Sequence, residues 1–166
     1  MRWFWIDRVT HLEKGRIARA VKNVSLAEEH LHDHFPLYPV MPQALIIEGM
    51  AQTGGILAGS VSDFRENIIL AKVSHAKFHR LVRPGDQMVF ESHLVDSGPS
   101  GYRAETRVTV EGVLVAESST MFAALPVGLT GADGSDASEG FVFKENLLAL
   151  LRECPGFDVS GGRPDG

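Results

Sequence analysis

Residues 34–58 read HFPLYPVMPQALIIEGMAQTGGILA, a proline-rich segment followed by a long apolar run. From Gln43 to about Ala58, apolar or small residues lie on nearly every side of a helical projection. Such a pattern predicts a helix that is buried on all sides, in place of an amphipathic surface helix. Pro42 stands where the helix can begin, because a missing N–H and a fixed φ suit the first helical turn.

The residues before this helix form a proline-rich segment, with prolines at positions 36, 39 and 42. Proline fixes its own φ and keeps the preceding residue out of the helical region. We therefore expect His34–Met41 to be a stiff, extended and non-helical loop. Such a loop would hold His34 in a fixed place relative to the start of the helix.

Strand-like segments lie on both sides of the helix. Before it, Trp3–Val9 and Arg16–Val24 read as strands joined by a turn around Glu13-Lys14-Gly15. After it, alternating and β-branched residues predict four more strands, at Ile68–Phe78, Gln87–Val95, Tyr102–Val110 and Val113–Leu125. One central helix followed by a long antiparallel meander predicts an α+β fold class.

The domain organisation follows from length and composition. The 166 residues are enough for one domain with a substantial core, which we expect to occupy residues 1–125. Residues 126–166 are expected to form a linker rich in Gly, Ser, Asp and Ala, then a short helix over Phe143–Glu153, then a flexible tail. The leucines of that helix predict that residues 141–152 pack on the body, because they would otherwise expose a large apolar patch.

Charge and composition argue against several classes of function. The net charge is −5, and residues 126–166 hold seven acidic against three basic residues, so the rest of the chain is nearly neutral. Without a basic excess, a nucleic-acid surface is not expected. Cys154 is the only cysteine, which rules out an intramolecular disulfide. We find neither a signal peptide nor an apolar run of the ~20 residues that span a bilayer, and we expect a cytoplasmic protein without membrane insertion.

Glu48 and His34 are the candidate catalytic residues. An ionised, unpaired carboxylate inside an apolar helix costs several kcal/mol, so Glu48 should be paired or protonated unless the helix exposes it to water. Gln52 lies four residues further on and shares its face. A lone histidine is usually structural, but His34 leads through a rigid loop into the helix that carries Glu48.

These groups together suit the removal of an α-proton from a thioester. A neutral imidazole is a suitable base near pH 7. The first N–H groups of the helix and its dipole would stabilise the enolate-like oxygen, and a carboxylic acid in an apolar site can protonate the departing hydroxyl. This chemistry requires no metal and no cofactor. A competing interpretation, a metal cluster of His30, His32, Asp33 and His34, matches none of the usual zinc spacings.

From His34 to Gln52 the sequence also resembles the signature of the 3-hydroxyacyl-acyl carrier protein dehydratases, the FabZ/FabA family. Lys77–Asp86 is similar to the second block of that family, and Tyr102–Leu125 to its closing strands. The resemblance covers about residues 1–125. It implies a hot-dog fold, in which a curved antiparallel sheet wraps a long helix. It also implies an obligate homodimer, often assembled further into a hexamer.

The resemblance further implies the roles of the site residues. His34 would be the catalytic histidine and Glu48 the catalytic acid, contributed by opposite subunits of one dimer. The backbone N–H of Gln43 matches the group that polarises the thioester carbonyl, and Gln52 matches a residue near the site. Glutamate at position 48, where aspartate would be the other choice, favours the plain dehydratase branch over the dehydratase-isomerases.

The same resemblance implies how the substrate arrives. It would be a 3-hydroxyacyl chain linked through phosphopantetheine to acyl carrier protein, in fatty-acid synthesis or a related lipid or polyketide route. Tyr38 adds bulk close to the site, where it would narrow or gate the substrate tunnel. Arg80 and Arg83 are candidates for docking the acidic carrier protein, although arginines near a turn are more often simply solvated.

Two departures from the family pattern leave alternatives open. The family usually has glycine at the positions of Leu37 and Gln43, and glycine permits backbone angles that these residues tolerate poorly. A strained Gln43 would weaken the contact to the thioester oxygen. One alternative is a hot-dog thioesterase in which Glu48 activates water. Another is a non-catalytic acyl-binding or scaffold subunit.

Overall fold

The protein folds around a six-stranded antiparallel sheet with the strand order β1-β2-β4-β5-β6-β3. The computed structural model describes residues 4–99, 101–125, 151–152 and 154. Its strands are β1 (Arg8–Glu13), β2 (Ile17–Asn23), β3 (Asn67–Phe78), β4 (Gln87–Gly98), β5 (Gly101–Val110) and β6 (Val113–Leu125). Consecutive strands β4, β5 and β6 form a meander, as predicted, whereas β3, the first strand of the predicted meander, pairs with β6.

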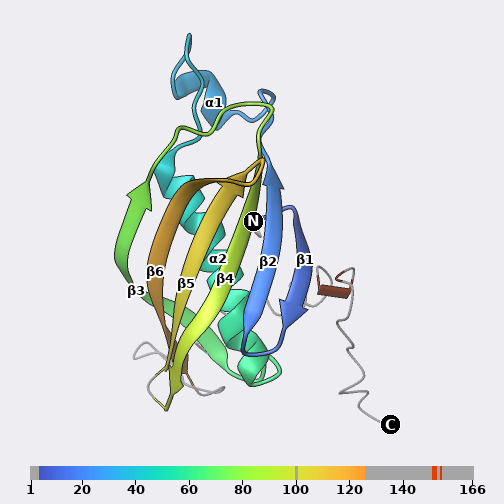
Figure 1. The fold of residues 1–166 in the computed structure, drawn as a ribbon, viewed down its shortest axis with the longest axis vertical. Coiled ribbons are helices and arrows are strands. Elements are labelled where there is room, and N and C mark those ends of the chain that lie inside the picture. Colours follow the sequence, from blue (N-terminus) through green and yellow to red (C-terminus); the bar gives the residue numbers. More distant parts are fainter. Residues whose placement is uncertain (1–3, 100, 126–150, 153, 155–166) are drawn as a thin grey trace, which may run out of the picture.

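A long helix, α2 (Gln43–Val61), crosses one face of the curved sheet, and a short helix, α1 (His30–Asp33), lies beyond the end of the sheet (Figure 1). This arrangement confirms the α+β class and the hot-dog fold. α2 is long and apolar enough to cross a membrane by length and composition alone. However, 61% of its apolar window is buried inside the fold, as is usual for the core helix of a soluble protein.

α2 lies very close to the sheet because small residues face it. A Cβ added at Gly49 would lie only 2.4 Å from Cζ of Phe90, a fully buried residue on β4. A larger residue at position 49 would therefore push the helix off the sheet. This contact belongs to a core cluster that also includes Ile46, Met50 and Met88.

β3 forms one edge of the sheet and pairs only with β6 among the strands described. Most of its 12 residues are exposed or half-buried, and the side chains of Ile69 and Leu70 are 37% and 41% exposed. A long edge strand with apolar side chains exposes unpaired backbone groups that can pair with another chain. This edge therefore presents unpaired backbone groups next to exposed apolar side chains.

Several element boundaries differ from those predicted. The expected first strand, Trp3–Val9, is confirmed only at Arg8 and Val9, because β1 runs from Arg8 to Glu13; Trp3 lies outside the described residues. The backbone N–H groups of Trp5 and Ile6 donate to the side chain of Gln52 and so make no ladder bonds there. α2 continues to Val61, three residues beyond the predicted end, and α1 was not predicted.

The C-terminal extension lies largely outside the described residues, so the predicted linker and tail stay predictions. Leu151 and Cys154 are described, and both are buried in the main core cluster. Burial raises the pKa of the Cys154 thiol. The prediction that the extension packs on the body is thus confirmed for Leu151. The other three leucines of the predicted helix, Leu147, Leu148 and Leu150, lie outside the described residues.

Candidate active site

His34 lies on a tight turn directly after α1. Phe35 N–H donates to the Tyr38 carbonyl at 3.3 Å, and Tyr38 N–H donates back to the Phe35 carbonyl at 2.9 Å. The segment is non-helical, as predicted, but it turns sharply where an extended chain was expected. Val40 N–H closes the loop by donating to the His34 carbonyl at 2.9 Å.

The imidazole of His34 is oriented by the same loop. Its Nδ1 lies 2.9 Å from the carbonyl oxygen of Val40. A carbonyl oxygen can only accept, so the proton of the neutral ring is on Nδ1 and the lone pair is on Nε2. The ring also stacks on Phe35, with centroids 4.4 Å apart. Nε2 is therefore the atom that can act as a base.

The segment that carries His34 is tied to the sheet through a buried cation. Lys22 on β2 is 8% exposed, and its Nζ donates to Glu28 at 2.6 Å, just before α1. The same Nζ lies 3.4 Å from Asp7 and 4.8 Å from the ring centroid of Trp5. Removing one partner of such a pair leaves a poorly solvated charge, so the pair restrains the start of the loop.

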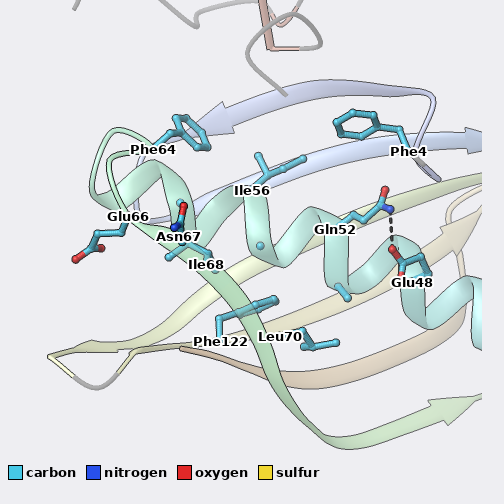
Figure 2. Close-up of a pocket in the computed structure, with 13 residues that line it drawn as sticks. Phe4, Glu48, Gln52, Ile56, Phe64, Glu66, Asn67, Ile68, Leu70 and Phe122 are labelled. Atoms are coloured by element: carbon cyan, nitrogen blue, oxygen red, sulfur yellow. Dashed lines mark hydrogen bonds between the residues drawn. The ribbon is translucent and has the colours of Figure 1, made fainter. Parts of the chain in front are cut away.

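Glu48 is held by its neighbour on α2. Gln52 Nε2 donates to Glu48 Oε1 at 2.7 Å, which confirms that the two side chains share a face (Figure 2). Gln52 Oε1 accepts from the backbone N–H groups of Trp5 at 2.9 Å and Ile6 at 3.3 Å. Because those groups can only donate, they orient the amide with its NH₂ toward Glu48. The role of the N-terminal segment was not predicted, since residues 3–9 read only as a strand.

Glu48 and Gln52 line a largely apolar groove of about 250 Å³ that follows α2 (Figure 2). The other helix residues on its wall are Ala51, Gly55, Ile56 and Gly59. Beyond the helix it is lined by Phe4, Phe64, Glu66, Asn67, Ile68, Leu70 and Phe122. A largely apolar groove that also carries the carboxyl groups of Glu48 and Glu66 suits an aliphatic chain with a reactive polar head.

The groove does not unite all the predicted site residues. Among the residues described, it is lined by Glu48 and Gln52 but not by His34, Tyr38 or Gln43. Gln43 is exposed at the first position of α2, where backbone N–H groups have no partner within the helix. Within one chain, the groove beside the predicted acid is thus not lined by the predicted base.

The strain expected at Leu37 and Gln43 is absent. The non-glycine residues with positive φ, in the part of the chain that the structure describes, are Asp63, Phe64 and Glu111. Leu37 is 98% exposed on the outside of the turn, where a side chain meets no obstacle. The expected backbone strain was wrong, because neither position 37 nor position 43 has a left-handed φ. Neither position therefore requires glycine.

Tyr38 and Arg83 are in direct contact, which the sequence did not predict. The guanidinium carbon of Arg83 lies 4.2 Å from the ring centroid of Tyr38. Both residues are exposed, and Arg80 is exposed on the same connection between β3 and β4. Tyr38 and Arg83 therefore place an aromatic ring and a positive charge at the turn that carries His34.

The metal interpretation finds no support in the geometry. Within the described residues, no three His, Cys, Asp or Glu side chains come together as a metal site. The four residues of that interpretation lie in α1 and at its C-cap: His30, His32, Asp33 and His34. His32 Nε2 instead lies 3.1 Å from the Leu26 carbonyl, and the ring of His30 packs edge-on against Trp5.

Comparison with known proteins places the chain within a family. The family model described as "FabA-like domain" matches residues 3–119. A 3-hydroxyacyl-[acyl-carrier-protein] dehydratase FabZ from Listeria welshimeri is 40% identical over 119 residues, 71% of this chain and 83% of that protein. The FabZ of Thiobacillus denitrificans is 39% identical over 120 residues, 70% of this chain and 83% of its own length.

Solved structures agree on the fold. The smu.793 protein of Streptococcus mutans bound to acetyl CoA has a TM-score of 0.63 at 16% identity, covering 76% of this chain and 94% of its own. Thioesterase HI1161 of Haemophilus influenzae has a TM-score of 0.59 at 12% identity, covering 71% and 77%. At these identities the likeness shows the fold alone, so it does not favour a thioesterase.

Proposed function

We propose, from the premise that this chain belongs to the FabA-like domain family, that it is a 3-hydroxyacyl-[acyl-carrier-protein] dehydratase. It would convert 3-hydroxyacyl thioesters into trans-2-enoyl thioesters by removing water. The observation that carries the proposal is Glu48, held by Gln52 at the head of an apolar groove. Identity near 40% with curated FabZ enzymes supports the same reaction.

In the proposed mechanism, His34 Nε2 removes a proton from the carbon next to the thioester carbonyl. The Val40 carbonyl keeps the other ring nitrogen protonated, so Nε2 points its lone pair outward as the base. The electron pair of the broken C–H bond forms the new C=C bond. Negative charge that develops on the carbonyl oxygen is stabilised by the backbone N–H of Gln43 at the start of α2.

Glu48 completes the elimination in its protonated form. It gives its proton to the hydroxyl on the β-carbon as the C–O bond breaks, and water leaves. Gln52 donates to Oε1 of Glu48, so we assign Oε2 of Glu48 as the oxygen that faces the leaving group. After one turnover His34 has gained a proton and Glu48 has lost one. Return of a proton from His34 to Glu48 resets the site.

We further propose that the protein works as a homodimer with shared sites, and that dimers assemble into a trimer of dimers. Two observations support the dimer. The groove of one chain is lined by Glu48 without His34, and the long edge strand β3 exposes apolar side chains beside that groove. A two-fold arrangement would bring His34 of one subunit to Glu48 of the other, twice per dimer.

The proposed partner is acyl carrier protein, an acidic protein that delivers the substrate on phosphopantetheine. Arg83 beside the His34 turn and Arg80 on the same connection between β3 and β4 provide exposed positive charge for that encounter. The proposed location is the cytoplasm. We also propose that residues 1–125 form the catalytic domain and that residues 126–166 are an extension, anchored at Leu151.

A turnover assay with the full chain tests the function. We expect hydration of crotonyl-pantetheine and dehydration of 3-hydroxybutyryl-pantetheine, with much slower hydrolysis of either thioester. Release of free thiol as the main product would identify a thioesterase. Binding of both compounds without either reaction would identify a non-catalytic acyl-binding subunit.

A further inference from the structure

The groove beside Glu48 ends at an aromatic wall. Along α2 it extends from Glu48 to Gly59, a distance of ~16 Å at the usual rise of an α-helix. Past Val61 the chain leaves the helix and turns back, and Phe64 lines the groove at this end (Figure 2). Phe64 is 8% exposed, so its ring is packed into the fold.

An unusual turn puts the Phe64 ring in this position. Asp63 and Phe64 have φ of 54° and 57°, in the left-handed region where helix ends usually place glycine. Phe64 N–H donates to the Gly59 carbonyl at 2.8 Å and caps the helix. A bulky residue with positive φ persists only where its surroundings hold it there.

Gly59 is the matching feature on the helix. A Cβ at position 59 would lie 2.9 Å from Cδ1 of Phe64, closer than side chains normally approach. The ring therefore packs directly on the helix backbone and leaves no passage between them. The turn and the glycine together fix an aromatic ring at this end of the groove.

We propose that Phe64 is the residue that sets the maximum acyl-chain length of this enzyme. The proposal rests on the proposed function, because it takes the occupant of the groove to be the acyl chain of the thioester whose head reacts beside Glu48. The groove holds about 250 Å³. Since a cavity of ~150 Å³ accommodates benzene, this volume corresponds to roughly ten carbon atoms, a medium-length chain.

The surroundings of Phe64 reinforce the limit. Glu66 and Asn67 follow it on the groove wall, and Glu66 Oε2 accepts a hydrogen bond from the Tyr102 hydroxyl at 2.9 Å. Burial, with a smaller contribution from Glu66, raises the pKa of Tyr102. A methyl end that passed Phe64 would meet a carboxylate and an amide, where an apolar group gains little.

The test measures binding of saturated acyl-pantetheines of four to sixteen carbons to the full-length protein by calorimetry. Saturated chains cannot be dehydrated, so the measurement does not depend on turnover. For the unchanged protein we expect affinity to rise by roughly fourfold per methylene and to stop rising near ten carbons. The variant Phe64→Gly removes the ring and also suits the positive φ, so its affinity should continue to rise beyond that length.

Asp63→Gly is the matched control. It relieves the same kind of backbone angle one residue earlier and loses two exposed ion pairs, with Lys14 and Arg65, but it leaves the ring in place. The control should keep the cut-off of the unchanged protein. If Phe64→Gly folds and keeps that cut-off, or if Asp63→Gly shifts it equally, Phe64 does not set the length.

A second variant works in the opposite direction. Gly55 lines the groove ~10 Å along α2 from Glu48, and a Cβ there would lie 3.5 Å from Phe122, an ordinary contact. Gly55→Leu should therefore shorten the accepted chain, even if Phe64→Gly fails to fold. An unchanged length profile in Gly55→Leu would show that the acyl chain does not follow α2 and would overturn the proposal.

The two proposals fail in distinguishable ways. If the protein dehydrates no 3-hydroxyacyl thioester but its binding cut-off moves with Phe64→Gly, the reaction is wrong and the length limit stands. If 3-hydroxybutyryl-pantetheine is dehydrated but the chain length at which affinity stops rising is the same in both variants as in the unchanged protein, the reaction stands and the length limit is wrong.

Discussion

The two halves of the proposed site are built in different ways. His34 lies on an exposed turn and is oriented by a backbone carbonyl, with Leu37 and Tyr38 exposed beside it. Glu48 lies on the central helix and is oriented by Gln52, which the N-terminal segment holds in turn. Each half is positioned without the other. This independence indicates that the two halves can come from different subunits without loss of geometry.

The largest expected effect comes from removing either half. His34→Ala removes the base and Glu48→Gln removes the acid, and each should reduce turnover of 3-hydroxybutyryl-pantetheine by at least ~10²-fold. Steady-state rates together with thermal melting check this prediction. Near-normal rates in either folded variant would rule out its catalytic assignment.

Mixing the two inactive variants tests whether the halves lie on different subunits. After unfolding and reassembly, about half of the dimers should be mixed, and each mixed dimer has one site with His34 and Glu48 both intact. Recovered activity should approach roughly a quarter of the unchanged protein if sites act independently. If mass spectrometry confirms mixed dimers and no activity returns, both groups come from one chain.

The sequence predicted the parts of the site that depend on local pattern. The apolar run after Pro42 predicted α2, and the spacing of Glu48 and Gln52 predicted their contact, because a helix places residues four apart on one face. The meander followed from turn residues between alternating strands. These features depend only on neighbours in the chain, which a single sequence displays.

The features that the sequence missed depend on contacts between distant segments. The bonds from Trp5 and Ile6 to Gln52 span more than forty residues, and the residues between carry no sign of them. Phe64 reads as an ordinary apolar residue after a helix, and its role follows only from its positive φ and its contact with Gly59. The wrong expectation at Gln43 arose because a family glycine was taken to signal a left-handed angle.

A smaller effect is expected at Gln52, which connects Glu48 to the N-terminal segment. Gln52→Ala removes the donor to Glu48 and the acceptor for Trp5 and Ile6, so kcat should fall by roughly tenfold and the melting temperature should drop. Gln52→Glu keeps the acceptor but replaces the donor with a second carboxyl group, which repels an ionised Glu48. It should lower kcat with a smaller loss of melting temperature.

The pair of variants separates positioning from stability. A merely structural role would make kcat follow the melting temperature in both proteins. A role in orienting Glu48 lowers kcat in Gln52→Glu even where the fold is stable, with KM nearly unchanged. Full kcat in a stable Gln52→Glu protein would show that Glu48 is oriented without this bond.

The smallest effect is expected at Arg83, on the exposed half of the site. Its guanidinium covers the Tyr38 ring, so the residue offers both charge and a flat surface near the His34 turn. Exposed charges contribute only ~0.2–1 kcal/mol each, so Arg83→Ala should raise KM by at most about fivefold. The rise should appear with carrier-linked substrate and vanish with the pantetheine thioester, because only the carrier protein is acidic.

Arg83→Lys keeps the charge without the flat stacking surface and should restore KM if attraction to the carrier is the cause. Added salt should reduce the difference between Arg83→Ala and the unchanged protein, since screening removes the same attraction. An equal rise in KM for both substrates would instead assign Arg83 to the shape of the entrance through Tyr38.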